Sequence, residues 1–201
     1  NPGGDTHTRE DLEYATTYNW KVKVTQSDGK TTTSGVRNFT IRTNDFNGGR
    51  GTKDDPFEIA DWEQLNSVRD YPDDHFILVN ALTDAVSGHA TYATKNASNS
   101  NKGWEPIGDS GTPFTGSFNG DGYTISDLTI DRPATDNVGL FGLTNDASIS
   151  NFEMVDCNVT GQNRVGSVVG DAYNSTVIRD INLKRISVDG TSTVGGFAGR
   201  F

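Results

Sequence analysis

Aspartates and asparagines are the side chains through which this sequence could bind a cation. The 201 residues include 21 Asp but only 6 Glu. Asp54 and Asp55 are adjacent, and Asn119 and Asp121 flank a glycine. Each pair could offer oxygen ligands to Ca²⁺, which takes about 6–8 of them, although neither has the full Asp-x-Asp-x-Asp-Gly spacing. We favour the competing interpretation of solvated turns in which Asp, Asn and Gly serve the backbone. Ca²⁺ is the one cofactor that the sequence leaves open.

Aromatic side chains could contact a sugar, because an aromatic ring offers a flat apolar face. Tyr92, Trp104 and Tyr123, together with Phe114, would provide such a platform. We favour the alternative that these residues close the end of a hydrophobic core. Glycans therefore remain candidate ligands, and Tyr92, Trp104 and Tyr123 are the candidate contacts.

Catalysis on a polysaccharide would need acids that converge on one face, or a basic side chain beside a metal. Neighbouring copies of a repeat can bring such groups together, so a polysaccharide lyase or glycoside hydrolase stays an alternative. Arg164, Arg179 and Arg185 show no pattern beyond an exposed face, and no histidine lies near Cys157 in the sequence. We therefore predict no catalytic residue and no enzymatic activity, and we assign Cys157 to the core.

Four sequons permit N-linked glycosylation, at Asn38, Asn96, Asn158 and Asn174. A sequence this rich in Asn, Ser and Thr contains about that many by chance, so the sequons do not argue for the modification. Asn96 lies in a polar stretch, residues 87–102, that shows no apolar periodicity. Stretches of this length are usually functional or mobile.

The net charge narrows the range of partners. Lys and Arg number 17 against 27 Asp and Glu, which gives a formal charge of −10. A nucleic-acid backbone or an anionic lipid surface is therefore a poor partner. The longest apolar runs have four to five residues, far short of the roughly 20 that a transmembrane helix needs. We expect no nucleic acid and no membrane insertion. The expected partners are other surface proteins, copies of this chain or glycans.

The rest of the composition predicts an all-β protein. Thr, Gly and Asn number 24, 23 and 18, and these residues favour strands and turns over helices. Residues 12–43 alternate between apolar and polar positions on either side of the turn Ser27-Asp-Gly-Lys, which is typical of a β-hairpin. The glycine-rich stretch Phe46–Gly51 is the predicted domain boundary.

The lead-in to this hairpin resembles a known module. Leu12-x-Tyr14-x-Thr16-x-Tyr18 is similar to the Leu-x-Pro-x-Thr-x-Tyr of fibronectin type III modules, with Tyr14 in place of the proline. The resemblance covers only the F and G strands and implies that residues 1–45 are part of such a β-sandwich. A plain hairpin is the alternative. Because two strands alone are marginal in water, the missing strands would come from upstream, from the next domain or from another subunit.

A second unit is predicted to begin after the boundary, with an N-terminal cap and first strands in residues 46–136. Asp61 can cap a short helix, near residues 61–69, that places Trp62, Leu65 and Val68 on one face. Residues 76–79 are predicted to form a short buried strand.

The sequence repeats itself from residue 125 onward. The pattern that begins Ile149-x-x-Phe152 and continues to Gly161 recurs from Ile178 with an offset of 29 at six positions. The stretch 125–130 starts the same pattern at an offset of 24 before Ile149. Copies of this length cannot close a core alone, so they must stack. The repeats therefore predict a solenoid, most simply a right-handed parallel β-helix.

A second motif interleaves with the first. It occurs as Val138-Gly-Leu-Phe-Gly, Val165-Gly-Ser-Val-Val-Gly and Val194-Gly-Gly-Phe-Ala-Gly. These copies are similar to GLUG repeats, which occur in large bacterial and archaeal surface proteins and near some secreted peptidases. The resemblance assigns residues 137–201 to GLUG-type repeats.

The stretches before these copies also resemble the opening of that family. They are Gly51-Thr-Lys-Asp-Asp-Pro-Phe-Glu-Ile, Trp104-Glu-Pro-Ile-Gly and Phe114-Thr-Gly-Ser-Phe-Asn-Gly-Asp-Gly-Tyr-Thr-Ile, with Asn119 in place of the usual Asp. The likeness covers about residues 46–201 and implies a β-helical surface or adhesin-like module with no defined catalytic residue.

These resemblances imply an extracellular, cell-surface protein with a structural or adhesive role, alone or as a subunit of a larger assembly or filament. A carbohydrate-binding adhesin and a β-helical polysaccharide-degrading enzyme are the alternatives. We expect the chain to be a piece of a longer protein, with repeats that continue after residue 201.

Overall fold

The computed structural model describes residues 17–40 and 45–201, and the chain divides into two compact units, residues 1–44 and 45–201. Leu12, Tyr14 and Thr16, which carry the resemblance to the fibronectin corner, lie outside the described residues. The further division of the second unit at residue 136 stays a prediction.

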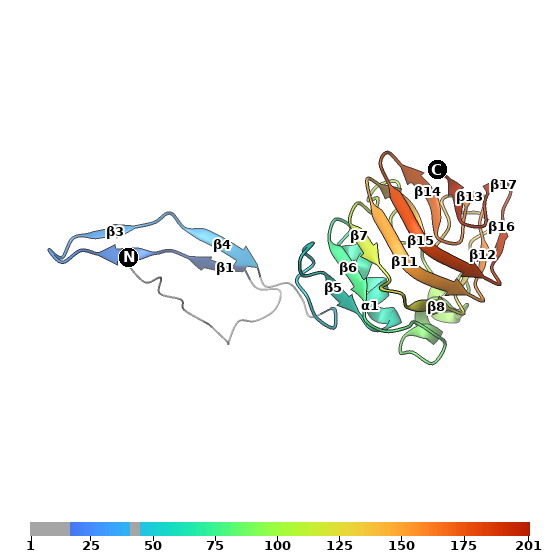
Figure 1. The fold of residues 1–201 in the computed structure, drawn as a ribbon, viewed down its shortest axis with the longest axis horizontal. Helices are drawn as coiled ribbons and strands as arrows, with labels where there is room; N and C mark the ends of the chain where they lie inside the picture. The colour runs from blue at the N-terminus through green and yellow to red at the C-terminus, as the bar shows by residue number, and fades with distance from the viewer. Residues whose placement is uncertain (1–16, 41–44) are drawn as a thin grey trace. The chain divides into compact units, whose positions relative to one another are not determined.

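The described part of the first unit is an antiparallel hairpin (Figure 1), in which β1 pairs with β4 and β2 with β3. At its turn Gly29 has a φ of +82°, and Asp28 Oδ1 accepts a hydrogen bond from the Lys30 amide. The predicted hairpin is confirmed, and the fibronectin assignment stays a prediction. The strands are β1 (Thr17–Trp20), β2 (Lys23–Thr25), β3 (Thr31–Thr33) and β4 (Arg37–Thr40).

The second unit begins with a strand, a helix and a second strand. Asp61 Oδ1 accepts a hydrogen bond of 2.8 Å from the Gln64 amide and caps the helix, as predicted. Trp62 and Leu65 of this helix and Val68 of the 3₁₀ turn that follows it are fully buried. The elements are β5 (Phe57–Ile59), α1 (Trp62–Ser67), the 3₁₀ turn η1 (Val68–Asp70) and β6 (His75–Leu78), which begins one residue before the strand that the sequence predicts.

Every pairing between named strands from β5 onward is parallel, and the largest sheet has the order β15-β11-β7-β6-β5, with β8 also beside β11 (Figure 1). The strands that join β5 and β6 in this sheet are β7 (Ser117–Asn119), β8 (Thr124–Ser126), β11 (Ser148–Val155) and β15 (Val177–Lys184). Strands far apart in the sequence thus lie side by side.

Three smaller parallel sheets take the remaining strands, with the orders β16-β12-β9, β10-β14-β18 and β13-β17. Their bounds are β9 (Thr129–Asp131), β10 (Phe141–Asn145), β12 (Asn158–Thr160), β13 (Asn163–Val165), β14 (Val169–Tyr173), β16 (Ser187–Asp189), β17 (Ser192–Val194) and β18 (Ala198–Arg200).

Paired positions in the last two copies follow the 29-residue step that the repeat predicts, because Ile149 pairs with Ile178 and Met154 with Leu183. The shorter offset predicted for the stretch 125–130 is wrong. Ile125 pairs with Met154, so this stretch follows the same 29-residue step. Each copy contains the same apolar spacing twice in succession, so the stretch 125–130 fits both the first and the second half of the next copy in sequence, and the strand pairing shows that it matches the second half.

The earlier strand β7 makes a longer step, since Phe118 pairs with Ile149. The two extra residues are accommodated in the turn between β7 and β8. There Asn119 Oδ1 accepts a 3.0 Å hydrogen bond from the Asp121 amide, and Gly122 has a φ of +80°. A surface turn thus restores the register before the next strand.

Corners between strands recur at the same positions of successive copies. Asp127, Asp156 and Arg185 occupy one such position in three copies and have φ values of +62°, +54° and +52°. Asn151 and Asp180 form a second such pair, at +65° and +57°. Asn and Asp adopt this left-handed conformation more readily than most residues. Backbone conformation therefore accounts for part of the acidic composition.

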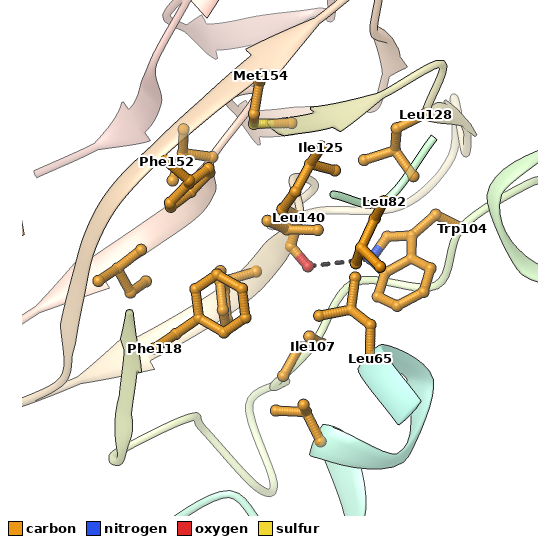
Figure 2. Packing of buried hydrophobic residues seen from close by; sticks show 14 of the residues in the cluster. Leu65, Leu82, Trp104, Ile107, Phe118, Ile125, Leu128, Leu140, Phe152 and Met154 are labelled. Atoms are coloured by element: carbon orange, nitrogen blue, oxygen red, sulfur yellow. Dashed lines mark hydrogen bonds between the residues drawn. The ribbon is translucent and has the colours of Figure 1, made fainter. Parts of the chain in front are cut away.

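The core of the second unit is filled by apolar side chains from the strands, from α1 and from the segments between them (Figure 2). Cys157 is fully buried among them, opposite Ile186 of the next copy, whose following residue Ser187 donates its amide to the Cys157 carbonyl. Burial raises the pKa of the Cys157 thiol to about 11. The assignment of Cys157 to the core is confirmed.

Strands dominate the described residues and helices are few, so the all-β prediction is confirmed. The right-handed parallel β-helix goes further than these pairings and stays a prediction. In the described ranges, no helix is long and apolar enough to cross a bilayer.

Candidate functional site

The polar stretch at residues 87–102 is folded by its own side chains. It contains a π-helical turn, η2 (His89–Ala93), and a 3₁₀ turn, η3 (Ala97–Asn99). Asn96 Oδ1 accepts hydrogen bonds from the Ser98 and Asn99 amides, and Asn96 Nδ2 donates to three backbone carbonyls. These bonds give the stretch a defined shape although its sequence has no apolar period.

The stretch is also anchored to the core. The His89 ring lies 5.5 Å from the Trp62 ring, and His89 Nε2 lies 3.0 Å from the Asp127 carbonyl oxygen. Ala93 is fully buried. Thr91 and Tyr92, which lie between these two anchored residues, line one pocket.

This pocket, which we call the loop pocket, has a volume of about 490 Å³. Tyr92 contributes a half-buried aromatic ring, and Lys102 contributes an exposed cation. Its other lining residues are mainly amides, hydroxyls and one charge of each sign: Asn66, Thr91, Ser98, Asn99, Ser100, Gly103, Trp104, Glu105 and Arg132. An aromatic face beside amides and charges is suited to a polar ligand with hydroxyl groups.

Trp104 lines the loop pocket, but its ring is buried and has no exposed face on which a sugar could stack. Its side chain is fully buried, and Nε1 donates a 3.1 Å hydrogen bond to the Leu140 carbonyl (Figure 2). The Arg69 guanidinium lies 5.3 Å from the centre of its ring. Trp104 is therefore not available as an exposed sugar contact. It belongs to the core, as expected from the favoured interpretation that these aromatic residues close the end of a hydrophobic core. Phe114 is also fully buried.

The predicted aromatic contacts do not form one platform. Tyr92 and Trp104 line the loop pocket, whereas Tyr123 lies in the turn between β7 and β8, is 37% exposed and does not line that pocket. Tyr92 is thus the predicted contact that offers a ring to this pocket.

Two arginines stand beside Trp104. Arg69 donates from Nε to the Asn66 carbonyl, from Nη1 to the Pro106 carbonyl and from Nη2 to the Glu105 carbonyl. Arg132 donates from Nε to the Trp104 carbonyl at 2.9 Å. Burial lowers the pKa of both guanidinium groups, because desolvation disfavours their charged form, and Glu105 opposes this effect electrostatically. Neither arginine can be singled out from the sequence alone, because nothing in its local sequence distinguishes it from the other arginines.

The calcium candidates lie in turns and in two separate places. Asp55 Oδ2 accepts a 2.5 Å hydrogen bond from Arg50 Nε. Asn119 Oδ1 accepts a hydrogen bond from the Asp121 amide in the turn before β8. Within the described ranges, no group of three or more His, Cys, Asp or Glu side chains is placed to hold a metal ion. Calcium binding at Asp54, Asp55, Asn119 and Asp121 stays the less favoured alternative to solvated turns.

The four sequons differ in how their amides are used. Asn38 on β4 and Asn158 on β12 are exposed. Asn174 is exposed with a φ of +52°, and its Nδ2 donates to Asn145 Oδ1. Asn96 uses Nδ2 within its own loop, so a glycan there, which replaces one of the two hydrogens on Nδ2, would break part of the hydrogen bonding that shapes the loop.

Two known proteins are similar in sequence to this chain. Halomucin of Haloquadratum walsbyi is 32% identical over 174 residues, which cover 81% of this chain and 2% of halomucin. A protein of Evansella cellulosilytica described as a Gly-rich membrane protein is 31% identical over 145 residues, which cover 69% of this chain and 16% of that protein. The chain thus corresponds to a small part of each relative. No family model and no solved structure matches it.

Proposed function

We propose that this chain is a segment of an extracellular surface protein, in which a right-handed parallel β-helix of GLUG-type repeats has a structural or adhesive role. The observation that carries the proposal is the 29-residue step between the last two copies, which recurs in four sheets. Because the step is 29 residues in all four sheets, the apolar residues of one copy lie against the matching residues of the copy beside it. Solenoid proteins are built in this way.

The two relatives support a surface- or membrane-associated character. Their names describe a mucin and a membrane protein, and in both the similar segment is a small fraction of a much longer chain. A module of this kind suits a repeated building block of a long surface protein. Residues 1–45 would be the end of a fibronectin type III module, and the antiparallel hairpin there is compatible with its F and G strands.

Electron microscopy of the protein as its source cells release it, with the subunit mass measured on the same sample, tests this role. Ordered filaments of a subunit of about this size would support an assembling structural protein. Single rods from a much larger polypeptide would support a module of a long surface protein. Recovery of the protein only from inside the cells, untouched by a protease added to intact cells, would contradict the surface assignment.

A carbohydrate-binding adhesin is the second candidate, and the loop pocket with the Tyr92 ring is the observation that favours it. Electrophoresis through gels that contain polysaccharides tests this candidate, because binding retards the band. Tyr92→Ala should abolish the retardation, whereas Tyr173→Ala, which removes an exposed ring from β14, should not. A cleared zone around the band would instead favour the alternative of a polysaccharide-degrading enzyme.

A further inference from the structure

Arg132 differs from the other arginines of the second unit in how its charge is used. Five of these arginines form an ion pair with an aspartate: Arg50, Arg164, Arg179, Arg185 and Arg200. Among the described residues, only Arg69 and Arg132 of this unit have no such pair.

The two unpaired guanidinium groups are not equivalent. Arg69 donates to three carbonyls, so all three of its nitrogens are engaged. Arg132 uses only Nε, in the bond to the Trp104 carbonyl. In the part of the chain that the structure describes, its two outer nitrogens have no hydrogen-bond partner. These outer nitrogens can form a parallel pair of hydrogen bonds with a carboxylate.

The surroundings of Arg132 fix its orientation. The Trp104 carbonyl that accepts from Nε belongs to a residue whose own indole is bonded to Leu140 inside the core. The Arg132 amide donates to the Thr160 carbonyl of the neighbouring copy. A guanidinium held at Nε has less freedom to lose when a ligand binds to its outer nitrogens.

Arg132 borders two pockets, and their charges decide which one suits an anion. The second pocket is also about 490 Å³, and its charged lining is more acidic than basic, so it disfavours a carboxylate: the acids are Asp70, Glu105, Asp109 and Asp136, and the bases are Arg69 and Arg132. The loop pocket contains Lys102 and Arg132 against a single acid, Glu105, which is exposed and forms no ion pair among the described residues. The loop pocket therefore favours an anion.

We propose that the loop pocket binds a carboxylate-bearing sugar, whose carboxylate accepts two hydrogen bonds from the outer nitrogens of Arg132. The Tyr92 ring packs against an apolar face of the sugar, and the side-chain amide of Asn66 lines the pocket where it can bond the sugar's hydroxyls. Lys102 adds a second positive charge. This inference rests on the glycan-binding role proposed for the pocket and adds the class of sugar.

A set of matched sugars tests the inference on the full 201-residue chain. The probes are immobilised oligosaccharides that end in glucuronic acid, galacturonic acid or N-acetylneuraminic acid, each beside its neutral methyl ester. We expect at least one acid to bind at least tenfold more tightly than its ester. Added salt should reduce this preference, because the decisive contact is between charges.

Substitutions locate the binding. Arg132→Gln removes the charge and should abolish the preference for the acid, whereas Arg179→Gln, an exposed arginine of β15, should leave it unchanged. Lys102→Gln, at an exposed position, should weaken the acid several-fold. Glu105→Gln should strengthen binding of the acid, because it removes the one carboxylate that lines the loop pocket. Circular dichroism of each variant checks its fold.

The outcomes separate this inference from the wider proposal. If Tyr92→Ala abolishes binding but acids and esters bind equally, the pocket binds glycans and the acidic-sugar inference is overturned. A preference for the acid that survives Arg132→Gln would also overturn it. If none of the probes binds, the acidic-sugar inference is overturned, while the glycan-binding role is decided separately by retardation in the polysaccharide gels.

Discussion

Cys157 is buried in the core of the second unit, and its environment determines its reactivity. Burial raises its pKa from 9.0 to about 11, so the nucleophilic thiolate is scarce near neutral pH. We expect Ellman's reagent to react with the native chain at about pH 8 only over hours, and with the chain in guanidinium chloride within minutes. Rapid reaction of the native chain would contradict this placement of the thiol.

The same shift predicts a dependence of stability on pH. Below about pH 9 the thiol is protonated in both states and has no effect. Between about pH 9 and pH 11 only the unfolded chain releases the proton, so the free energy of unfolding falls as the pH rises, by roughly 1–3 kcal/mol in total. Cys157→Ala should remove this part of the pH dependence. Urea titrations of both chains across this pH range measure the difference.

Asp171 is the buried carboxylate on which two copies of the repeat converge. Its side chain is 1% exposed and accepts hydrogen bonds from Arg200 Nε at 2.7 Å and Nη2 at 2.8 Å, and Arg164 Nε lies 3.2 Å away. Asp171→Asn should lower the free energy of unfolding by about 2 kcal/mol, because the arginines lose their shared partner. The control Asp180→Asn, at an exposed ion pair with Arg179, should change it by less than about 0.5 kcal/mol.

The sequence predicted the residue types of the candidate site better than their arrangement. Tyr92 could be singled out because an aromatic residue in a polar stretch is conspicuous. The free outer nitrogens of Arg132 could not, because they depend on where the aspartates of other copies lie. Trp104 could be assigned to either a surface or a core, and its full burial and its bond to Leu140 decide between them.

Gly170 shows why the second repeated motif keeps its glycines. A Cβ on this residue of β14 would lie 2.4 Å from the carbonyl carbon of Asn137 and 2.5 Å from the Val138 nitrogen, both of which are backbone atoms. Gly170→Ala should therefore lower the free energy of unfolding by about 1–3 kcal/mol. Gly196→Ala is the matched control, since no atom lies within 4 Å of its Cβ position. Equal stability of the two variants would contradict the close approach of neighbouring copies.

The strands were predictable where periodicity is unambiguous. The helix after Asp61, the hairpin and the 29-residue step all follow from local patterns. The step of the stretch 125–130 did not, because two identical spacings in each copy make the alignment ambiguous without knowledge of the pairing. The turns η2 and η3 were missed because side-chain hydrogen bonds from Asn96 and Asn99, and not an apolar period, determine them.

The hydrophobic core of the described chain belongs to the second unit. All buried apolar residues in the described part of the chain lie from Phe46 onward, while Trp20 and Val24 of the hairpin are 44% and 57% exposed. A fragment of residues 45–201 should therefore have the circular dichroism and the thermal midpoint of the second unit in the full chain, within about 2 °C. A markedly lower midpoint would mean that the first 44 residues contribute to its stability.

The 29-residue step between the last copies also has a consequence for the gene. A DNA segment that encodes one whole copy preserves the reading frame when it is duplicated or lost by recombination between neighbouring copies. The new protein would then contain one stack of paired strands more or fewer, with each junction using contacts that already exist, such as Ile149 against Ile178. Selection can thus change the length of such a protein without first having to find a new fold.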